Sequence, residues 1–248
     1  MSTPILEVEH VRKAFGGVVA NKDVSLSVPE GKIYGLIGPN GSGKTTLFNS
    51  IVGQHPIDAG AIRFEGHDIS KLRVAQIARL GLLRTFQQTR IYRGMTCMQN
   101  MLISLPPAEL GFRAVYRRST PRDERNAEDL LRFVGLHPKR NLRAGDLSFG
   151  QQKLLEFAMA LMSKPRMLLL DEPTAGINPT LINDLLQRLR EANREFGITL
   201  LVIEHNMRVI MELAEYIYCL AHGELLAHGK PEQVQSDQRV LDAYLGAH

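Results

Sequence analysis

The sequence predicts an α/β fold with a mostly parallel sheet, an N-terminal antiparallel sheet beside it and a helical insertion. Strand, loop and helix alternate around residues 32–52 and again from 167 to 213, which is the order of parallel strands joined by helical crossovers. Closely spaced strand patterns with turn signals, such as Gly16-Gly17, indicate the antiparallel part. Between about residues 95 and 146 no strand pattern is convincing, and we interpret this stretch as mostly helical.

The expected elements follow from hydrophobic periodicity. Short apolar runs predict strands at residues 6–11, 24–28, 32–37, 61–64, 167–170, 199–203, 216–220 and 224–227. Longer periodic runs predict helices at residues 44–52, 74–80, 121–134, 150–162, 181–196 and 207–213. We expect a single domain over residues 1–248, in which about 1–94 and 165–248 form the core with the antiparallel sheet and about 95–164 form a helical subdomain.

Composition limits the function without defining it. Hydrophobic residues make up 44% of the 248 residues, enough for a sizeable core. The net charge of +4 is too small to argue for nucleic acid and suits an anionic ligand or an anionic membrane surface equally well. Cys97 and Cys219 stand in no pairing motif, which favours free thiols in a reducing compartment. The N-terminus lacks a signal pattern and the apolar runs are too short to cross a bilayer, so we expect a soluble, cytosolic chain.

A phosphate-loop motif, G-x-x-x-x-G-K-[ST], is matched in full between the strand and the helix expected around residues 32–52. Backbone N–H groups of such a loop point at phosphate oxygens, and the helix presents its positive N-terminal end to the same anion. We expect Lys44 to neutralise the β- and γ-phosphates of ATP and Thr45 to offer its hydroxyl to Mg²⁺. The sequence therefore predicts a P-loop NTPase-type core. The expected nucleotide-binding residues of the loop are Gly38, Asn40, Gly41, Ser42, Gly43, Lys44, Thr45 and Thr46.

Two acids, Asp171 and Glu172, end the apolar strand expected at residues 167–170. Ligands of open α/β folds bind at the carboxyl edge of the sheet. Asp171 is expected to hold Mg²⁺ through water, and Glu172 to act as the general base that takes a proton from the attacking water. Two acids that simply end a strand in solvent are the alternative, and the phosphate loop upstream favours the functional interpretation. The adjacent glutamate also counts against a kinase, which needs no water-activating base.

The run Leu147-Ser148-Phe149-Gly150-Gln151 resembles the signature motif of ABC-type ATPases, usually written L-S-G-G-Q. The order of motifs along essentially the whole chain is also similar to that family: phosphate loop, glutamine loop, signature, acidic strand end and late histidine. The resemblance implies that Ser148, Gly150 and Gln151 contact the nucleotide held by a second subunit. An ordinary helix N-cap at Ser148 is the alternative, and both interpretations can be true.

The same resemblance implies roles for three more residues. Gln87 matches the loop glutamine that contacts Mg²⁺ and the attacking water, His205 matches the switch histidine at the γ-phosphate, and Phe15 matches the aromatic residue that stacks on adenine. A structural histidine and a core phenylalanine are the alternatives at the last two positions. The catalytic residues expected from the family are therefore Glu172, His205 and Gln87.

Two positions depart from the family pattern. Phe149 stands where the signature usually has glycine, which puts the local backbone geometry in question. Asn178, in Ala175-Gly176-Ile177-Asn178-Pro179, stands where many relatives have aspartate. The resemblance implies that this segment couples the two sites of a dimer, so the strength of that coupling stays open. The basic run at 113–118 also stays open, between a solvated surface and a docking surface near a membrane.

Finer sequence texture resembles the ATPase subunits of branched-chain amino-acid importers. Examples are Arg84-Thr85-Phe86-Gln87, Glu204-His205-Asn206-Met207 and Ala243-Tyr244-Leu245-Gly246. Importers of urea or short amides and ATPases that extract lipopolysaccharide share much of it and remain alternatives. A soluble ABC-type ATPase acting on nucleic acid or ribosomes is an alternative of another class. One phosphate loop, one signature, no long heptad run and no basic stripe count against it.

The resemblance also implies the partners and the location of the chain. The expected partners are a second ABC ATPase subunit (the same chain or a homologue), two transmembrane permeases and, indirectly, a periplasmic or extracellular substrate-binding protein. No nucleic acid is expected. The chain would lie peripherally on the cytoplasmic face of the cell membrane. A lone copy is expected to bind ATP with Mg²⁺ but to hydrolyse it poorly until it pairs.

Overall fold

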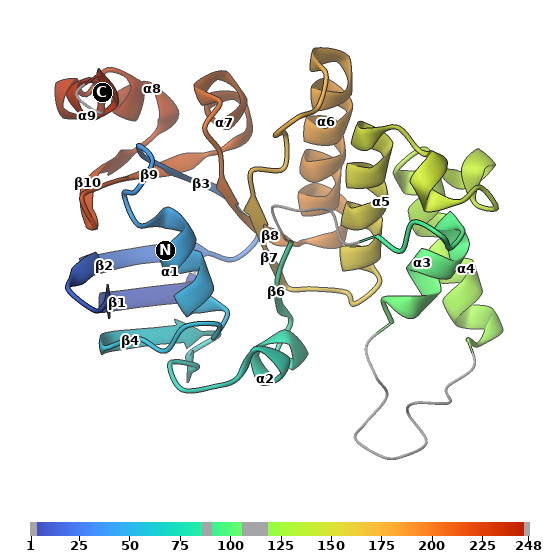
Figure 1. The fold of residues 1–248 in the computed structure, drawn as a ribbon, viewed down its shortest axis with the longest axis horizontal. Helices are drawn as coiled ribbons and strands as arrows, with labels where there is room; N and C mark the ends of the chain where they lie inside the picture. The colour runs from blue at the N-terminus through green and yellow to red at the C-terminus, as the bar shows by residue number, and fades with distance from the viewer. Residues whose placement is uncertain (1–3, 86–90, 106–118, 246–248) are drawn as a thin grey trace. The chain divides into compact units, whose positions relative to one another are not determined.

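The computed structural model describes residues 4–85, 91–105 and 119–245 (Figure 1). Contacts divide the chain into two compact units. The first comprises residues 1–84, 166–173 and 189–248, and the second comprises 85–165 and 174–188. The insertion expected at about 95–164 lies within the second unit, which also includes the segment that follows the acidic strand end.

A ten-stranded sheet forms the first unit, counted over the described residues, with the order β5-β4-β1-β2-β10-β9-β3-β8-β7-β6. Neighbours from β9 through β3, β8 and β7 to β6 run parallel, whereas β1, β2, β4 and β5 pair antiparallel. The predicted fold class is therefore confirmed. The bounds are β1 (Pro4–Phe15), β2 (Val18–Pro29), β3 (Ile33–Ile37), β4 (Ala59–Phe64), β5 (His67–Asp68), β6 (Leu82–Arg84), β7 (Met167–Asp171), β8 (Thr199–Ile203), β9 (Tyr216–Ala221) and β10 (Glu224–Gly229).

Burial explains which strands the sequence revealed in full. All residues of β7 and β8 are buried, as expected for parallel strands covered on both faces, and both were predicted to within one residue. β1 and β2 are each 12 residues long and extend well beyond their predicted ranges. Their outer ends contain polar residues such as Lys13 and Asn21, which interrupt the apolar run although both residues are buried.

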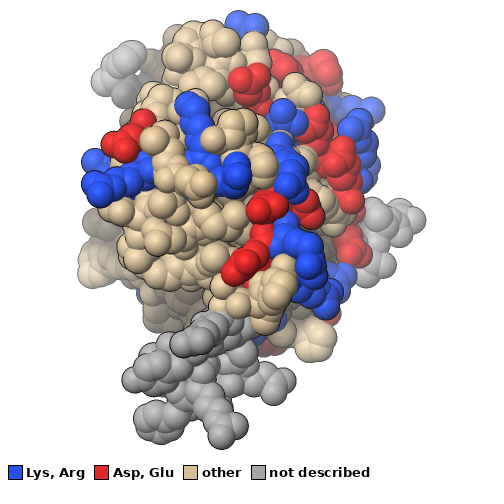
Figure 2. Space-filling view, turned by 90° about the vertical axis from the view of Figure 1, so that its right-hand side faces the viewer, with Lys and Arg blue, Asp and Glu red and all other residues tan. Residues whose placement is uncertain are grey.

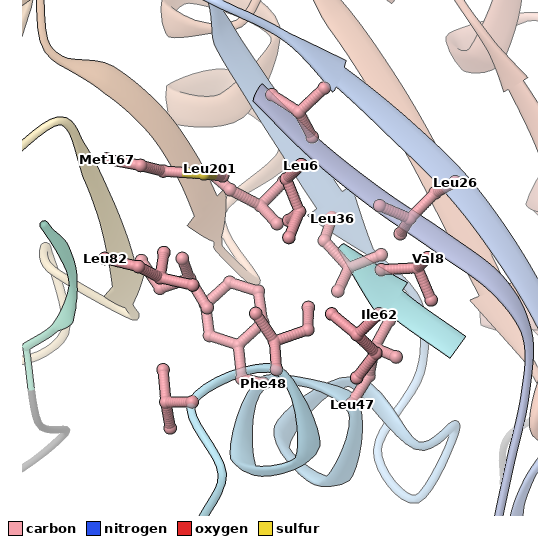
Figure 3. Close-up of a cluster of buried hydrophobic side chains, with 14 of the residues drawn as sticks. Leu6, Val8, Leu26, Leu36, Leu47, Phe48, Ile62, Leu82, Met167 and Leu201 are labelled. Atoms are coloured by element: carbon pink, nitrogen blue, oxygen red, sulfur yellow. The ribbon is translucent and has the colours of Figure 1, made fainter. Parts of the chain in front are cut away.

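The core of the first unit lies between the sheet and helix α1 (Lys44–Ile51) (Figure 3). Leu47 and Phe48 point from α1 toward strand residues such as Leu36 and Ile62, and all four are fully buried. Burying one such side chain stabilises a fold by about 1.5–3 kcal/mol. This packing fixes the start of α1 directly behind the loop that joins it to β3. The other helices that lie wholly in this unit are α2 (Val74–Arg79), α7 (Met207–Leu213), α8 (Pro231–Gln235) and α9 (Gln238–Leu245).

The second unit is helical over its described residues. Helices α3 (Cys97–Ile103), α4 (Pro121–Phe133) and α5 (Phe149–Leu161) pack against one another, with two short 3-10 helices at His137–Lys139 and Ala144–Asp146. The first half of α6 (Pro179–Phe196) belongs to this unit and the second half to the first. α4 begins where the sequence dictates, because Thr120 accepts from the Asp123 N–H and Pro121 occupies the first helical position.

Surface charges of both signs lie side by side on the face shown in Figure 2. Ion pairs also form along α4, where Arg132 pairs with Glu128 at 2.9 Å and with Asp129 at 2.7 Å. No helix in the described ranges is both long and apolar enough to pass through a membrane.

Candidate functional site

The phosphate loop joins β3 to α1 and lies tightly against the first unit's sheet. Gly38 has φ +146°, and a side-chain carbon there would lie 2.0 Å from the carbonyl oxygen of Leu220 in β9. Only glycine allows this approach. Gly38, Ser42 and Lys44 are buried, whereas Asn40, Gly41 and Thr45 are exposed. The exposed residues thus lie around the N-terminal turn of α1, where helix N–H groups are free to bind an anion.

Lys44 sits under this loop. Its Nζ donates to the carbonyl oxygens of Gly38 at 2.7 Å and Pro39 at 2.9 Å, and the residue is 5% exposed. Burial lowers the pKa of Lys44, and the negative charges of Glu172 and Asp171 act in the opposite direction. The lysine, the loop and both acids predicted from sequence are therefore brought together within the first unit.

Asp171 is the last residue of β7, and its carboxylate is already paired. Arg84, the last residue of the neighbouring strand β6, places Nη2 2.5 Å from Asp171 Oδ2. Both side chains are almost completely buried, at 8% and 1% exposure. Arg84 Nη1 also donates to Asn49 of α1. From the sequence, the motif around Arg84 was used for its glutamine and for its resemblance to a family, and this ion pair was missed. No local signal could have found this pair, because the two residues lie 87 positions apart in the sequence.

Glu172 and His205 meet at the carboxyl edge of the sheet. Glu172 follows β7 and His205 follows β8, and His205 Nε2 lies 2.5 Å from Glu172 Oε1. Glu172 has a φ of +49°, a left-handed backbone that is uncommon for a residue with a side chain. Its N–H donates to the Ile203 carbonyl at 2.9 Å, which anchors the strained peptide to β8. Strain of this kind gathers at functional sites, where the surrounding structure holds it in place.

Phe15 ends β1 and is 45% exposed, so the alternative of a core phenylalanine is wrong. His55 meets its ring edge-on with centroids 5.2 Å apart, and Lys13 Nζ lies 5.2 Å from its centroid. The predicted glutamine, Gln87, and the basic run at 113–118 lie outside the described residues.

The signature residues belong to the second unit. Ser148 caps α5: its hydroxyl accepts from the Gln151 N–H, and the Gln151 side chain accepts from the Ser148 N–H. The N-cap interpretation is therefore confirmed, and Ser148 itself remains exposed. Gly150 is buried and packs closely against Leu181, since a side-chain carbon at this position would lie 2.5 Å from it.

Both departures from the family pattern have a structural explanation. Phe149 is 46% exposed, and its ring packs over Gly176, where a side-chain carbon would lie 3.0 Å from the ring. The larger side chain thus lies on the surface and leaves the cap of α5 intact. Asn178 Oδ1 accepts from the Leu181 N–H at 2.9 Å at the start of α6. Asparagine caps a helix as well as aspartate does, so this exchange keeps the local structure.

A fold of this topology with a phosphate loop, a strand-end acid pair and a histidine at one sheet edge defines a P-loop ATPase. A sequence model of the family described as "ABC transporter" matches residues 21–175, and one described as "Branched-chain amino acid ATP-binding cassette transporter" matches residues 224–248. The chain belongs to the ABC transporter family. Within that family it is an ATP-hydrolysing, nucleotide-binding subunit.

Curated relatives match almost end to end. The chain is 40% identical over 253 residues to the high-affinity branched-chain amino acid transport ATP-binding protein BraF of Pseudomonas aeruginosa, covering 99% of each. It is 36% identical to the corresponding protein LivG of Escherichia coli K12, again over 99% of each. A probable LivG of Archaeoglobus fulgidus is 37% identical over 98% of this chain and 96% of its own length.

Solved structures agree with the fold. The ADP conformation of MJ1267, an ATP-binding cassette of an ABC transporter, superposes with a TM-score of 0.87 at 36% identity, covering 99% of this chain and 100% of that one. The cassette MJ0796 was solved as a dimer in a post-hydrolysis state with ADP and phosphate. It gives a TM-score of 0.77 at 25% identity over 91% of this chain and 98% of its own.

Proposed function

We propose that this chain binds and hydrolyses ATP to energise an importer of branched-chain amino acids. The proposed reaction rests on the contact between Glu172 and His205 at the carboxyl edge of the sheet. At the same edge the negative charges of Glu172 and Asp171 interact with Lys44. The cargo is supported by full-length relatives named for branched-chain amino-acid transport and by the family-specific C-terminal segment. No residue of this chain is assigned to the cargo, which would pass through partner subunits.

The proposed division of labour follows from where each group lies. Lys44 leaves the carbonyl oxygens of the loop and neutralises the β- and γ-phosphates. The phosphate oxygens accept hydrogen bonds from the backbone N–H groups of residues 41–46. Glu172 takes the proton of the attacking water, and His205 orients Glu172 through their contact and reaches the γ-phosphate. Phe15, half-exposed, offers its ring to adenine. By resemblance to the family, Gln87 would contact Mg²⁺ and the attacking water.

The donor set fits Mg²⁺. The described residues hold no cluster of three or more His, Cys, Asp or Glu that could bind a metal unaided. Mg²⁺ suits such a site, because it is usually bound by one or two protein oxygens together with water and substrate phosphates. The Thr45 hydroxyl would hold it directly and the Asp171 carboxylate through water, and it would neutralise phosphate charge.

The remaining partners are also proposed. Ser148, Gly150 and Gln151 would contact the nucleotide of a second ATPase subunit, either another copy or a homologue. Dimeric assembly of the cassette MJ0796 supports this pairing. Two permeases and an external binding protein would complete an importer, with this chain on the cytoplasmic face of the membrane.

The general-base role is tested by Glu172→Gln, with Glu215→Gln as the matched control on an exposed glutamate that pairs with Lys32. Glu172→Gln should keep ATP binding and lose at least a hundredfold in turnover, the lower end of what general-base catalysis contributes. Glu215→Gln should hydrolyse ATP as the original chain does. Undiminished turnover in Glu172→Gln would exclude this residue as the base.

The cargo is tested separately with the complex reconstituted from this chain, its permeases and its binding protein. Leucine, isoleucine or valine should stimulate ATP hydrolysis. Stimulation by urea or short amides alone would overturn the cargo and leave the ATPase assignment in place.

A further inference from the structure

The first peptide of the phosphate loop is held from both sides. The N–H of Gly38 donates to the hydroxyl oxygen of Tyr244 at 2.8 Å, across 206 residues of sequence. The carbonyl oxygen of the same residue accepts from Lys44 Nζ at 2.7 Å. Because Gly38 also lies directly against the Leu220 carbonyl, its peptide has no room to shift toward β9. One residue from the C-terminal helix thus helps to fix the orientation of the loop.

Tyr244 reaches this position because α9 is docked on the sheet. α9 contacts β10, and Val240, one turn before Tyr244 on the same helix face, is 1% exposed. Burial raises the pKa of Tyr244 to about 12, so its hydroxyl stays neutral at physiological pH. A neutral hydroxyl can accept from the Gly38 N–H without placing a negative charge beside the phosphates.

We propose that Tyr244 is a positioning residue for the phosphate loop, through which helix α9 sets the affinity of the site for nucleotide. This inference rests on the proposed role of the loop in binding ATP. The apparent dissociation constant of a site equals the intrinsic one divided by the fraction of molecules in the binding-competent arrangement. Removing the Tyr244 hydroxyl leaves the buried Gly38 N–H without that acceptor, so the loop spends less time in the competent arrangement.

The direct test is Tyr244→Phe in the full chain, with ADP affinity measured by titration calorimetry. ADP should bind roughly three- to tenfold more weakly, the range expected for one net hydrogen bond. Tyr218→Phe is the matched control. The Tyr218 hydroxyl is also buried and bonds to backbone, accepting from the Ser27 N–H at 3.1 Å and donating to the Ser27 carbonyl at 2.8 Å, but it does not touch the loop. The Tyr218→Phe variant should bind ADP with unchanged affinity. Thermal unfolding verifies that both variants fold.

Two further measurements separate the ways in which this inference could fail. Amide hydrogen exchange at Gly38 should be faster in Tyr244→Phe than in Tyr218→Phe, and equal rates would overturn the hydrogen bond itself. Lys44→Ala should abolish ADP binding. If it does so while Tyr244→Phe binds like Tyr218→Phe, the positioning role is wrong and the proposed function stands. If Lys44→Ala binds ADP normally, the proposed function fails, and this inference fails with it.

Discussion

At the scale of single residues, the most consequential feature is the buried ion pair of Arg84 and Asp171. Two opposite charges with 8% and 1% exposure depend on each other, because removing one leaves the other buried and uncompensated. Arg84 also ties the end of β6 to α1 through Asn49. It is the last residue of the first unit before the chain enters the second. The ion pair therefore fixes the position of the Asp171 side chain, independently of any role in catalysis.

We expect Arg84→Met to lower the free energy of unfolding by about 3–5 kcal/mol, the usual consequence of breaking a buried pair. Arg190→Met is the control, because Arg190 pairs with Glu212 on the surface, with both side chains more than 40% exposed. Arg190→Met should lower the free energy of unfolding by at most about 1 kcal/mol. Urea denaturation measures both variants, and equal costs would show that the Arg84 pair contributes no more than a surface contact.

The buried tyrosine Tyr218 gives the fold a dependence on alkaline pH. Burial raises the pKa of Tyr218 to about 12 from an ordinary value of 10.0. Between these values the unfolded chain has lost this proton and the folded chain keeps it. The free energy of unfolding should therefore fall as pH rises through this interval. Tyr218→Phe should make that decline shallower, as measured by denaturation at several pH values. An unchanged slope would contradict the raised pKa.

Sequence reasoning at this scale succeeded where a motif fixes the spacing. Lys44, Asp171, Glu172 and His205 were all named, and the first unit brings them together. It failed for Arg84 and Tyr244, because their partners come from distant strands and helices and no local pattern records such a contact.

At the scale of elements, helix α5 combines a structural and a proposed functional role in one residue. Ser148 caps the helix and is exposed. Aspartate is as good an N-cap as serine, whereas alanine is not. The two roles can therefore be separated by substitution.

Ser148→Ala should destabilise the chain by about 0.5–2 kcal/mol through loss of the cap. Ser148→Asp should keep the stability and abolish ATP hydrolysis, because its carboxylate would repel the phosphate of the nucleotide on the second subunit. Thermal unfolding and steady-state turnover measure the two effects. A fully active Ser148→Asp variant would confine this residue to capping.

Elements with a clear apolar pattern were predicted well, whether long or short. The buried strands β7 and β8 and helices α4, α5 and α7 match their predicted ranges closely. No separate range was predicted for α3, which lies in the stretch expected to be mostly helical, nor for α8 and α9, which each have a single buried residue and so present no apolar period. The capping box at Thr96 marks the start of α3, and prolines at the first helical position, Pro231 and Pro121, mark the starts of α8 and α4.

At the scale of the whole molecule, the proposed function requires each nucleotide site to be shared between two subunits. This chain supplies a phosphate loop with its acids and histidine in one unit and, in the other, a signature whose exposed Ser148 caps α5. Under this proposal a single copy carries two half-sites, and hydrolysis requires a pair.

The most direct measurement mixes Lys44→Ala and Ser148→Asp at a concentration where the original chain hydrolyses ATP. Each variant alone should be inactive, since every site in its dimers is defective. The mixture should recover activity, because a mixed pair joins the intact loop of one subunit to the intact signature of the other. A mixture as inactive as its components would contradict the shared site.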